Sequence, residues 1–273
     1  MGNNYSCYNC FSKELQGQTI ENSTSAYPYD NSSLEDSNYN RSKLFENETM
    51  EETYTESEAL SKTELIDTIN KTMQKFLEDI RQDPEKLGYK KVLTQNAVEV
   101  LLKDVSGGYS LMSIWKCSFP AEKVANFLRL VDKRKDWDSH VSECKKICDI
   151  SSDIAVYYTL YKRFLTMAPR DVLIVGQQLH LEDAWVDVST SINSSLVPET
   201  TSIVRAKIVL AGYYIQTIPK DENGNITLVT SVSEANFGQS LASGIVKNMS
   251  TNLTPKFVKA MIDGMKKFEA ELN

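Results

Sequence analysis

The last third of the chain, residues 203–272, constrains the fold more than any other stretch. Two apolar runs, residues 203–218 and 226–232, flank the polar segment Lys220-Asp-Glu-Asn-Gly224. Asn-Gly tolerates the positive φ angles of a tight turn, so this pattern predicts an antiparallel hairpin.

Residues 239–272 follow this hairpin with apolar side chains at steps of three and four, which predicts one long amphipathic helix. Pro255 removes a backbone donor within it, and we expect a kink there. The apolar face consists of Leu241, Ile245, Met249, Leu253, Phe257, Met261 or Ile262, Met265 and Phe268. A helix with one continuous apolar face needs a partner of its own length, and the preceding sheet is the expected partner.

The region before the hairpin combines one helix with many short strands. Ser61-Lys-Thr-Glu64 is typical of a capping box and begins an amphipathic helix that ends before Pro84. A short helix is expected over residues 121–131, followed by a polar bend at 132–138. The expected strands cover residues 98–105, 109–117, 143–150, 154–161, 172–181 and 185–191. This order predicts an α+β fold with an antiparallel sheet.

Charge is distributed unevenly along the chain. Residues 1–58 carry three basic and eleven acidic side chains, whereas the whole chain has a net charge of −7, so residues 59–273 are close to neutral. A near-neutral domain without a clustered basic face argues against nucleic acid as a partner. Residues 1–58 also lack sustained apolar periodicity, and we expect a disordered acidic leader ahead of a folded domain at residues 59–273.

The first ten residues carry an acylation motif. Met-Gly-x-x-x-Ser, with Gly2 and Ser6 in the required positions, predicts N-myristoylation. One myristoyl chain binds membranes weakly, and Cys7 and Cys10 are candidate palmitoylation sites for a second signal. The alternative is a chance Met-Gly start with two unused cysteines. Five irregularly spaced cysteines and the lack of an apolar signal segment favour a cytoplasmic protein held peripherally on a membrane.

A set of landmarks between residues 60 and 272 resembles the START domain, the steroidogenic-acute-regulatory-related lipid transfer family. They are Arg134-Lys-Asp-Trp-Asp138, Ala168-Pro-Arg-Asp171, Ser189 to Pro198, Ile203-Val-Arg-Ala206, Gly212, and Gly238 before the last helix. The resemblance implies a helix-grip fold, in which a curved antiparallel sheet grips the C-terminal helix around a cavity for one lipid. The helix and neighbouring loops would act as the lid of that cavity.

The resemblance is nearest to the phosphatidylcholine-transfer type and implies a phosphate contact. In that type, an Arg four residues before an Asp lies in the cavity and the Arg meets the phosphate. The matching residues are Arg134 and Asp138, and a guanidinium fork suits phosphate oxygens. The flanking Lys133 and Lys135 allow the alternative of a solvated surface cluster.

Other family positions divide between ligand contacts and structure. Tyr158 falls near a choline-binding Trp and is a candidate lipid contact. The other two cage aromatics match Val172 and Val209, which argues against choline recognition. The acid–Arg pair of sterol-binding relatives falls near Tyr157 and Gly176, so that pair is missing.

Four positions on the last helix are expected to face the cavity, with plain core packing as the alternative reading. They are Leu241, Ile245, Met249 and Leu253. Arg170, Asp171 and Arg205 also match family positions, and we interpret them as structural ion pairs.

Catalytic chemistry has little support in the sequence. His140, Cys144 and Cys148 would share one face and supply three metal ligands if their segment were helical, but the segment also has a strand pattern. Neither a Gly-rich phosphate loop nor a Gly-x-Ser-x-Gly elbow occurs. We therefore predict no metal and no cofactor.

These features together predict a non-enzymatic, monomeric lipid-binding or lipid-transfer protein that works at a membrane surface. A phospholipid is the favoured ligand and a sterol the second. The alternative is a lipid-regulated, membrane-anchored signalling or interaction module without net transfer. An enzyme of the wider helix-grip superfamily is the least supported reading.

Overall fold

The computed structural model describes residues 61–106, 108–163, 168–219, 225–236 and 243–272. Within them, ten strands form one sheet in the order β1-β2-β3-β10-β9-β7-β6-β5-β4, and neighbours in this order are antiparallel. The short β8 lies off this path and pairs in parallel with β6. The strands are β1 (Lys90–Gln95), β2 (Val98–Val105), β3 (Gly108–Cys117), β4 (Val141–Asp149), β5 (Ile154–Tyr161), β6 (Arg170–His180), β7 (Trp185–Ser191), β8 (Val204–Arg205), β9 (Lys207–Pro219) and β10 (Asn225–Asn236).

Four α-helices in the described residues accompany the sheet. They are α1 (Lys62–Ile80), α2 (Ala121–Leu128), α3 (Arg134–Trp137) and α4 (Ser243–Lys267), with 3-10 turns at Val131–Lys133 and Glu269–Glu271. The predicted capping box of α1 is confirmed: the Glu64 N–H donates to Ser61 Oγ (3.2 Å), and the Ser61 N–H donates to Glu64 Oε2 (2.7 Å). The last helix, α4, runs without a break through Pro255.

Two segments differ from the sequence prediction. Residues 132–138, expected to form a polar bend, are largely helical, because a 3-10 turn leads directly into α3. The edge strand β1 is not indicated by any apolar pattern. Among the described strands it pairs only with β2, and it exposes most of its side chains, so little of its sequence needs to be apolar.

One face of the sheet packs against α1, and we call it the α1 face. Leu65, Ile69, Met73 and Phe76 are buried there against apolar side chains of β5, β6, β7 and β9. Gly212 in β9 allows this close approach, because a Cβ at that position would lie 2.8 Å from the Phe76 ring. The apolar side chains of α1 thus cover the α1 face of the central strands.

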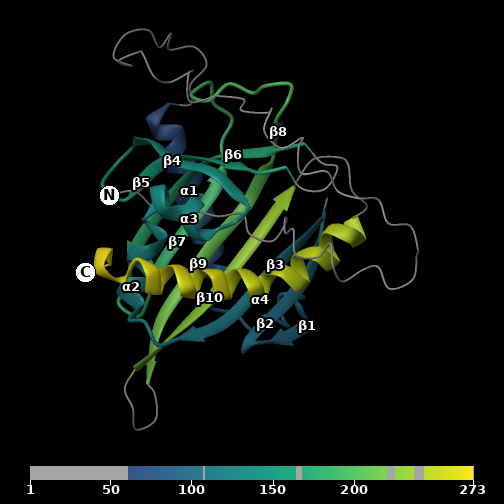
Figure 1. Ribbon diagram of the computed structural model, residues 1–273, viewed down its shortest axis with the longest axis vertical. Coiled ribbons are helices and arrows are strands. Elements are labelled where there is room, and N and C mark those ends of the chain that lie inside the picture. Colours follow the sequence, from purple (N-terminus) through teal and green to yellow (C-terminus); the bar gives the residue numbers. More distant parts are fainter. Residues whose placement is uncertain (1–60, 107, 164–167, 220–224, 237–242, 273) are drawn as a thin grey trace, which may run out of the picture. The chain divides into compact units, whose positions relative to one another are not determined.

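The opposite face, which we call the α4 face, packs against α4 and α2. Val258, Met261 and Met265 of α4 share one apolar cluster with side chains of α2, β2, β3, β9 and β10. Figure 1 shows α4 crossing this face of the sheet. The strands in this cluster, β2, β3, β10 and β9, are consecutive in the sheet order. The α+β helix-grip fold expected from the sequence is confirmed.

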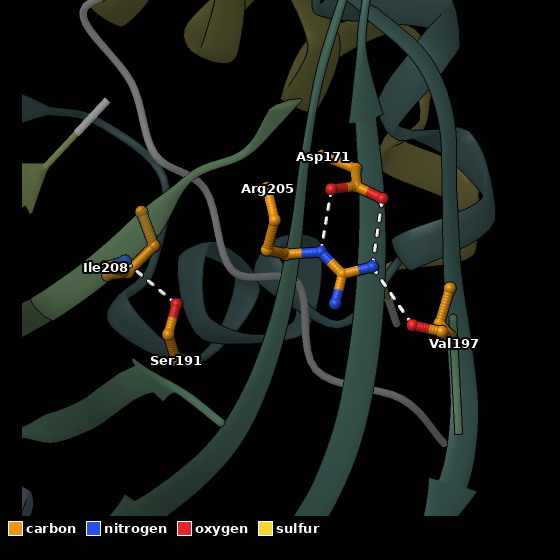
Figure 2. Close-up of polar contacts among 5 residues, drawn as sticks. All are labelled: Asp171, Ser191, Val197, Arg205 and Ile208. Carbon is orange, nitrogen blue, oxygen red and sulfur yellow. Dashed lines mark hydrogen bonds and ion pairs between the residues drawn. The ribbon is translucent and has the colours of Figure 1, made fainter. Parts of the chain in front are cut away.

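An ion pair at the end of β6 has the structural role predicted for Asp171 and Arg205 (Figure 2). Arg205 donates from Nε to Asp171 Oδ1 (2.7 Å) and from Nη2 to Oδ2 (3.1 Å). The same Nη2 also donates to the carbonyl oxygen of Val197 (3.0 Å). This fork joins β6 and β8 to the segment that connects β7 with β8. Arg170 has a different contact, donating from Nη1 to the carbonyl oxygen of Ala168 (2.8 Å).

Candidate functional site

A row of polar side chains crosses the α4 face at one register. The register partners run from Gln178 in β6 to Asp187 in β7, Tyr213 in β9, Ser231 in β10 and Ser113 in β3. All five side chains are buried. We call this set the polar row. Buried polar groups are costly unless they are hydrogen-bonded, so a row of them on an interior wall points to a use beyond packing.

The helix α4 closes over one end of the polar row. Thr254, Phe257, Val258 and Met261 of α4 enclose a gap of about 10 Å³ together with Trp115 and with three members of the row, Ser113, Tyr213 and Ser231. The hydroxyls of Ser113 and Ser231 lie 2.8 Å apart and bond to each other. A gap of this size holds about one water molecule. An acyl chain could enter here only if α4 moved away from the sheet.

Arg134 and Asp138 form a buried ion pair beside this gap. Arg134 is the first residue of α3 and Asp138 directly follows the helix. Their spacing of four residues places both side chains on one side of it. Arg134 Nη2 lies 2.6 Å from Asp138 Oδ2, with the two side chains 0% and 4% exposed. The guanidinium lies 4.8 Å from the centre of the Trp137 ring and 5.7 Å from that of Phe257 in α4. The alternative of a solvated cluster is therefore wrong for Arg134, while its neighbour Lys135 is exposed.

Tyr158 does not lie where its predicted role requires. Its side chain belongs to the apolar cluster of the α1 face, and the neighbouring Tyr157 belongs to a cluster on the other side. Successive residues of a strand point to opposite faces, and the register of β5 directs Tyr158 away from α4. Val209, matched to a second cage aromatic, is 46% exposed. The positions of a choline cage are therefore not brought together.

The predicted contacts on the last helix are only partly described. Leu253 lies in α4 and is buried, with 4% of its surface exposed. Ile245 and Met249 also fall within α4, but their side chains lie outside the described part, and Leu241 lies outside it altogether. The acylation sites Gly2, Cys7 and Cys10 lie outside the described residues too.

The metal alternative on His140, Cys144 and Cys148 is wrong, because the two cysteines lie in the strand β4 and His140 directly precedes it. A β-bulge between Lys146 and Cys148 shifts the register, and the two cysteines pack into different apolar clusters. Burial raises the pKa of the Cys144 thiol to about 11, which disfavours the thiolate that metals bind. Among the described residues, no group of three or more His, Cys, Asp or Glu side chains could hold a metal ion.

Gln178 and Asp187 were not among the sequence candidates. Gln178 Nε2 donates to Asp187 Oδ2 (2.8 Å) and to the carbonyl oxygen of Ala125 in α2 (3.1 Å). Burial raises the pKa of Asp187 well above its ordinary value, although the Gln178 hydrogen bond and the nearby Arg129 charge act in the opposite direction. A signal for this site existed, since Asp187 interrupts the otherwise apolar run from Trp185 to Val188.

A wider hollow of about 720 Å³ lies at the β6–β7 turn beside the start of α2. Its lining includes Trp185 and the carboxylates of Glu122, Glu182 and Asp183, and it opens to solvent. Acyl chains need enclosed apolar walls, so the interior beneath α4 is the better candidate for a lipid. Among the described helices, none combines the length and the apolar content needed to cross a bilayer.

Comparisons with known proteins agree with this geometry. A family model for the START domain matches residues 64–271. START domain-containing protein 10 of Homo sapiens is 28% identical over 153 residues, which cover 56% of this chain and 51% of that protein. Ceramide transfer protein of Homo sapiens is 23% identical over 152 residues, covering 50% of this chain and 24% of that protein.

The structural comparison gives the same fold. The structure of human StAR-related lipid transfer protein 5 superposes with a TM-score of 0.67 at 18% identity, covering 77% of this chain and 100% of that one. The chain spans about half the length, or less, of the curated relatives it matches. Since the family model covers most of the chain and both layers of the fold, this chain belongs to the START domain family.

Proposed function

We propose that this protein binds one lipid between α4 and the α4 face of its sheet and carries it between membranes without catalysing a reaction on it. The observation that carries the proposal is a set of buried polar groups: the Arg134–Asp138 pair at α3, and the polar row on an otherwise apolar wall beneath α4 and α2. The relative named ceramide transfer protein supports a carrier role.

The apolar and the polar side chains of this wall suit the two parts of a lipid, its acyl chains and its head group. Acyl chains gain about 25 cal/mol for each Å² of apolar surface removed from water, which needs no catalytic group. The head group must find hydrogen-bonding partners or remain in water. A phospholipid is the ligand that Arg134 suits best, because a guanidinium fork matches phosphate oxygens.

The helix α4 acts as the lid in this proposal. Where it faces Trp115, Tyr213 and Ser231, the described residues leave a gap of about 10 Å³. Entry of a chain at this gap would require α4 to separate from β3, β9 and β10, and closure of the helix would shield the chain from water. The acylated N-terminus, at Gly2 with Cys7 and Cys10, would hold the monomer near the membrane that supplies the lipid.

Native mass spectrometry of the 273-residue chain tests the proposal. After incubation with vesicles of phosphatidylcholine, phosphatidylethanolamine and cholesterol, we expect one added mass per protein, identified after extraction as a phospholipid. Transfer of labelled lipid from donor to acceptor vesicles then separates a carrier from an interaction module. A protein that stays lipid-free with all three lipids would refute the carrier role and favour the module.

A further inference from the structure

The end of the polar row beneath α2 keeps hydrogen-bonding capacity that the described residues do not use. Asp187 is fully buried and Gln178 is 2% exposed. The Gln178 amide group donates to Asp187 and to Ala125 of α2, yet its own oxygen Oε1 has no hydrogen-bond partner in the described part of the chain. Asp187 Oδ1 likewise has none among the residues that the structure describes. Two adjacent buried side chains therefore each present one unused oxygen.

The protonation state decides what these two oxygens offer. Burial raises the pKa of Asp187, so the interior favours its neutral form. A neutral carboxyl that accepts the Gln178 N–H at Oδ2 carries its proton on Oδ1, where it is a donor. The Gln178 Oε1 is an acceptor. In this neutral form, the pair presents one donor and one acceptor without a net charge.

The pair is connected to the proposed lipid site through Tyr213. Asp187 is the register partner of Tyr213, whose side chain lines the gap beneath α4. The same gap is bounded by Phe257, which the Arg134 guanidinium faces at 5.7 Å. Arg134 and the Gln178–Asp187 pair therefore each adjoin a residue that lines this gap.

We propose that Gln178 and Asp187 form a second, uncharged subsite that binds a hydroxyl or amide group of the lipid backbone. This inference rests on the proposed function. A hydroxyl and an amide both donate and accept, so either one satisfies Gln178 Oε1 and the Asp187 O–H together. An ester carbonyl only accepts, and it would leave the Gln178 oxygen buried without a partner, which lowers affinity.

Two lipids with one head group test this subsite. Phosphatidylcholine and sphingomyelin share phosphocholine, but the first has ester links and the second has an amide and a hydroxyl. From vesicles with equal amounts of both, with matched chains, the full-length protein should load sphingomyelin with about tenfold preference. Lysophosphatidylcholine, which has a hydroxyl and no amide, then identifies which group is bound.

Variants of the pair should change the lipid ratio. Asp187→Leu and Gln178→Leu should bring the ratio of the two lipids close to one, whereas Asp187→Asn, whose amide keeps a donor and an acceptor, should restore the preference. Gln177→Leu is the matched control, because Gln177 lies next in β6 on the other face and donates to Asp153 (2.7 Å). It should leave the ratio unchanged.

The outcomes separate this subsite from the function on which it rests. Loading of both lipids without preference, or a preference that survives Asp187→Leu and Gln178→Leu, would overturn the subsite and leave lipid binding in place. Failure of every variant and of the unaltered protein to load either lipid would overturn phospholipid binding itself. If Asp187→Leu does not fold, as judged by its thermal melt, the lipid ratio of Gln178→Leu decides between these outcomes.

Discussion

Substituting leucine for Arg134 separates the ligand role of the Arg134–Asp138 pair from its role in stability. The guanidinium is fully buried and Asp138 is 4% exposed, so the variant leaves a carboxylate in the interior without its cation. Breaking a buried pair in this way costs roughly 3–5 kcal/mol of unfolding free energy. For a domain of about 200 residues, this corresponds to a fall in Tm of about 10 °C.

Adding Asp138→Asn to Arg134→Leu should recover part of the lost stability but none of the binding. The asparagine is neutral, and its oxygen can still accept from the His140 N–H, which donates to Asp138 Oδ1 at 3.1 Å. Removing the charge while keeping this acceptor predicts a gain of about 2 kcal/mol over the single variant. Phospholipid uptake should stay low, because the guanidinium is still missing.

Arg205→Leu provides a control with the same chemistry elsewhere in the fold. It leaves Asp171, which is 3% exposed, without its cation where β6 pairs with β8. Urea unfolding measures the stability of each variant, and native mass spectrometry after incubation with phosphatidylcholine vesicles measures uptake. The ligand role of Arg134 is refuted if Arg134→Leu loads phospholipid as the unaltered protein does, or if Arg205→Leu lowers uptake equally.

Four further predictions follow from close contacts, a shifted pKa and the leader. Gly264→Ala would place a methyl 2.8 Å from the Phe127 ring and should loosen α4, which speeds release of labelled lipid to acceptor vesicles; unchanged release would contradict the lid. Gly212→Ala crowds Phe76 on the α1 face and should cost about 1–3 kcal/mol in urea unfolding without changing lipid uptake. Burial raises the folded-state pKa of Asp187. As the pH rises from about 4 toward that pKa, the folding equilibrium constant of the unaltered protein should therefore fall by up to about tenfold per pH unit relative to that of Asp187→Asn. Parallel stability profiles of the two proteins against pH would contradict this. Gly2→Ala should move the protein from the membrane fraction to the soluble fraction, and an unchanged distribution would exclude the acyl anchor.

Elements with a strong hydrophobic period were predictable, and weak ones were not. The helix α1 buries one face, so its spacing appears directly in the sequence, and the hairpins β2–β3 and β9–β10 appear as apolar runs separated by turn residues. The edge strand β1 buries little and has no such spacing. The single turn α3 is too short to show a helical period. The pairing of Arg134 with Asp138 was predicted from the family resemblance and not from their spacing alone.

The candidate site was less predictable because the central strands are buried on both faces. In β5, Tyr157 and Tyr158 are each 1% exposed, so the choice between them depends on register and not on hydrophobicity. In β7, Asp187 is polar within a buried strand, and this anomaly was a usable signal. Gln178 carries no comparable signal on its own, because only pairing with Asp187 places it in the polar row.

The polar row depends on packing that occurs on the other side of the sheet. Val186 and Val188 of β7 face α1, and Asp187 lies between them on the α4 face. A slip of one residue would exchange these faces, so that a carboxyl group met α1 and valines entered the row. Packing of α1 therefore both stabilises the sheet and holds the register of the row. Because α1 and α4 contact opposite faces, the lid movement proposed for α4 would leave these polar groups aligned.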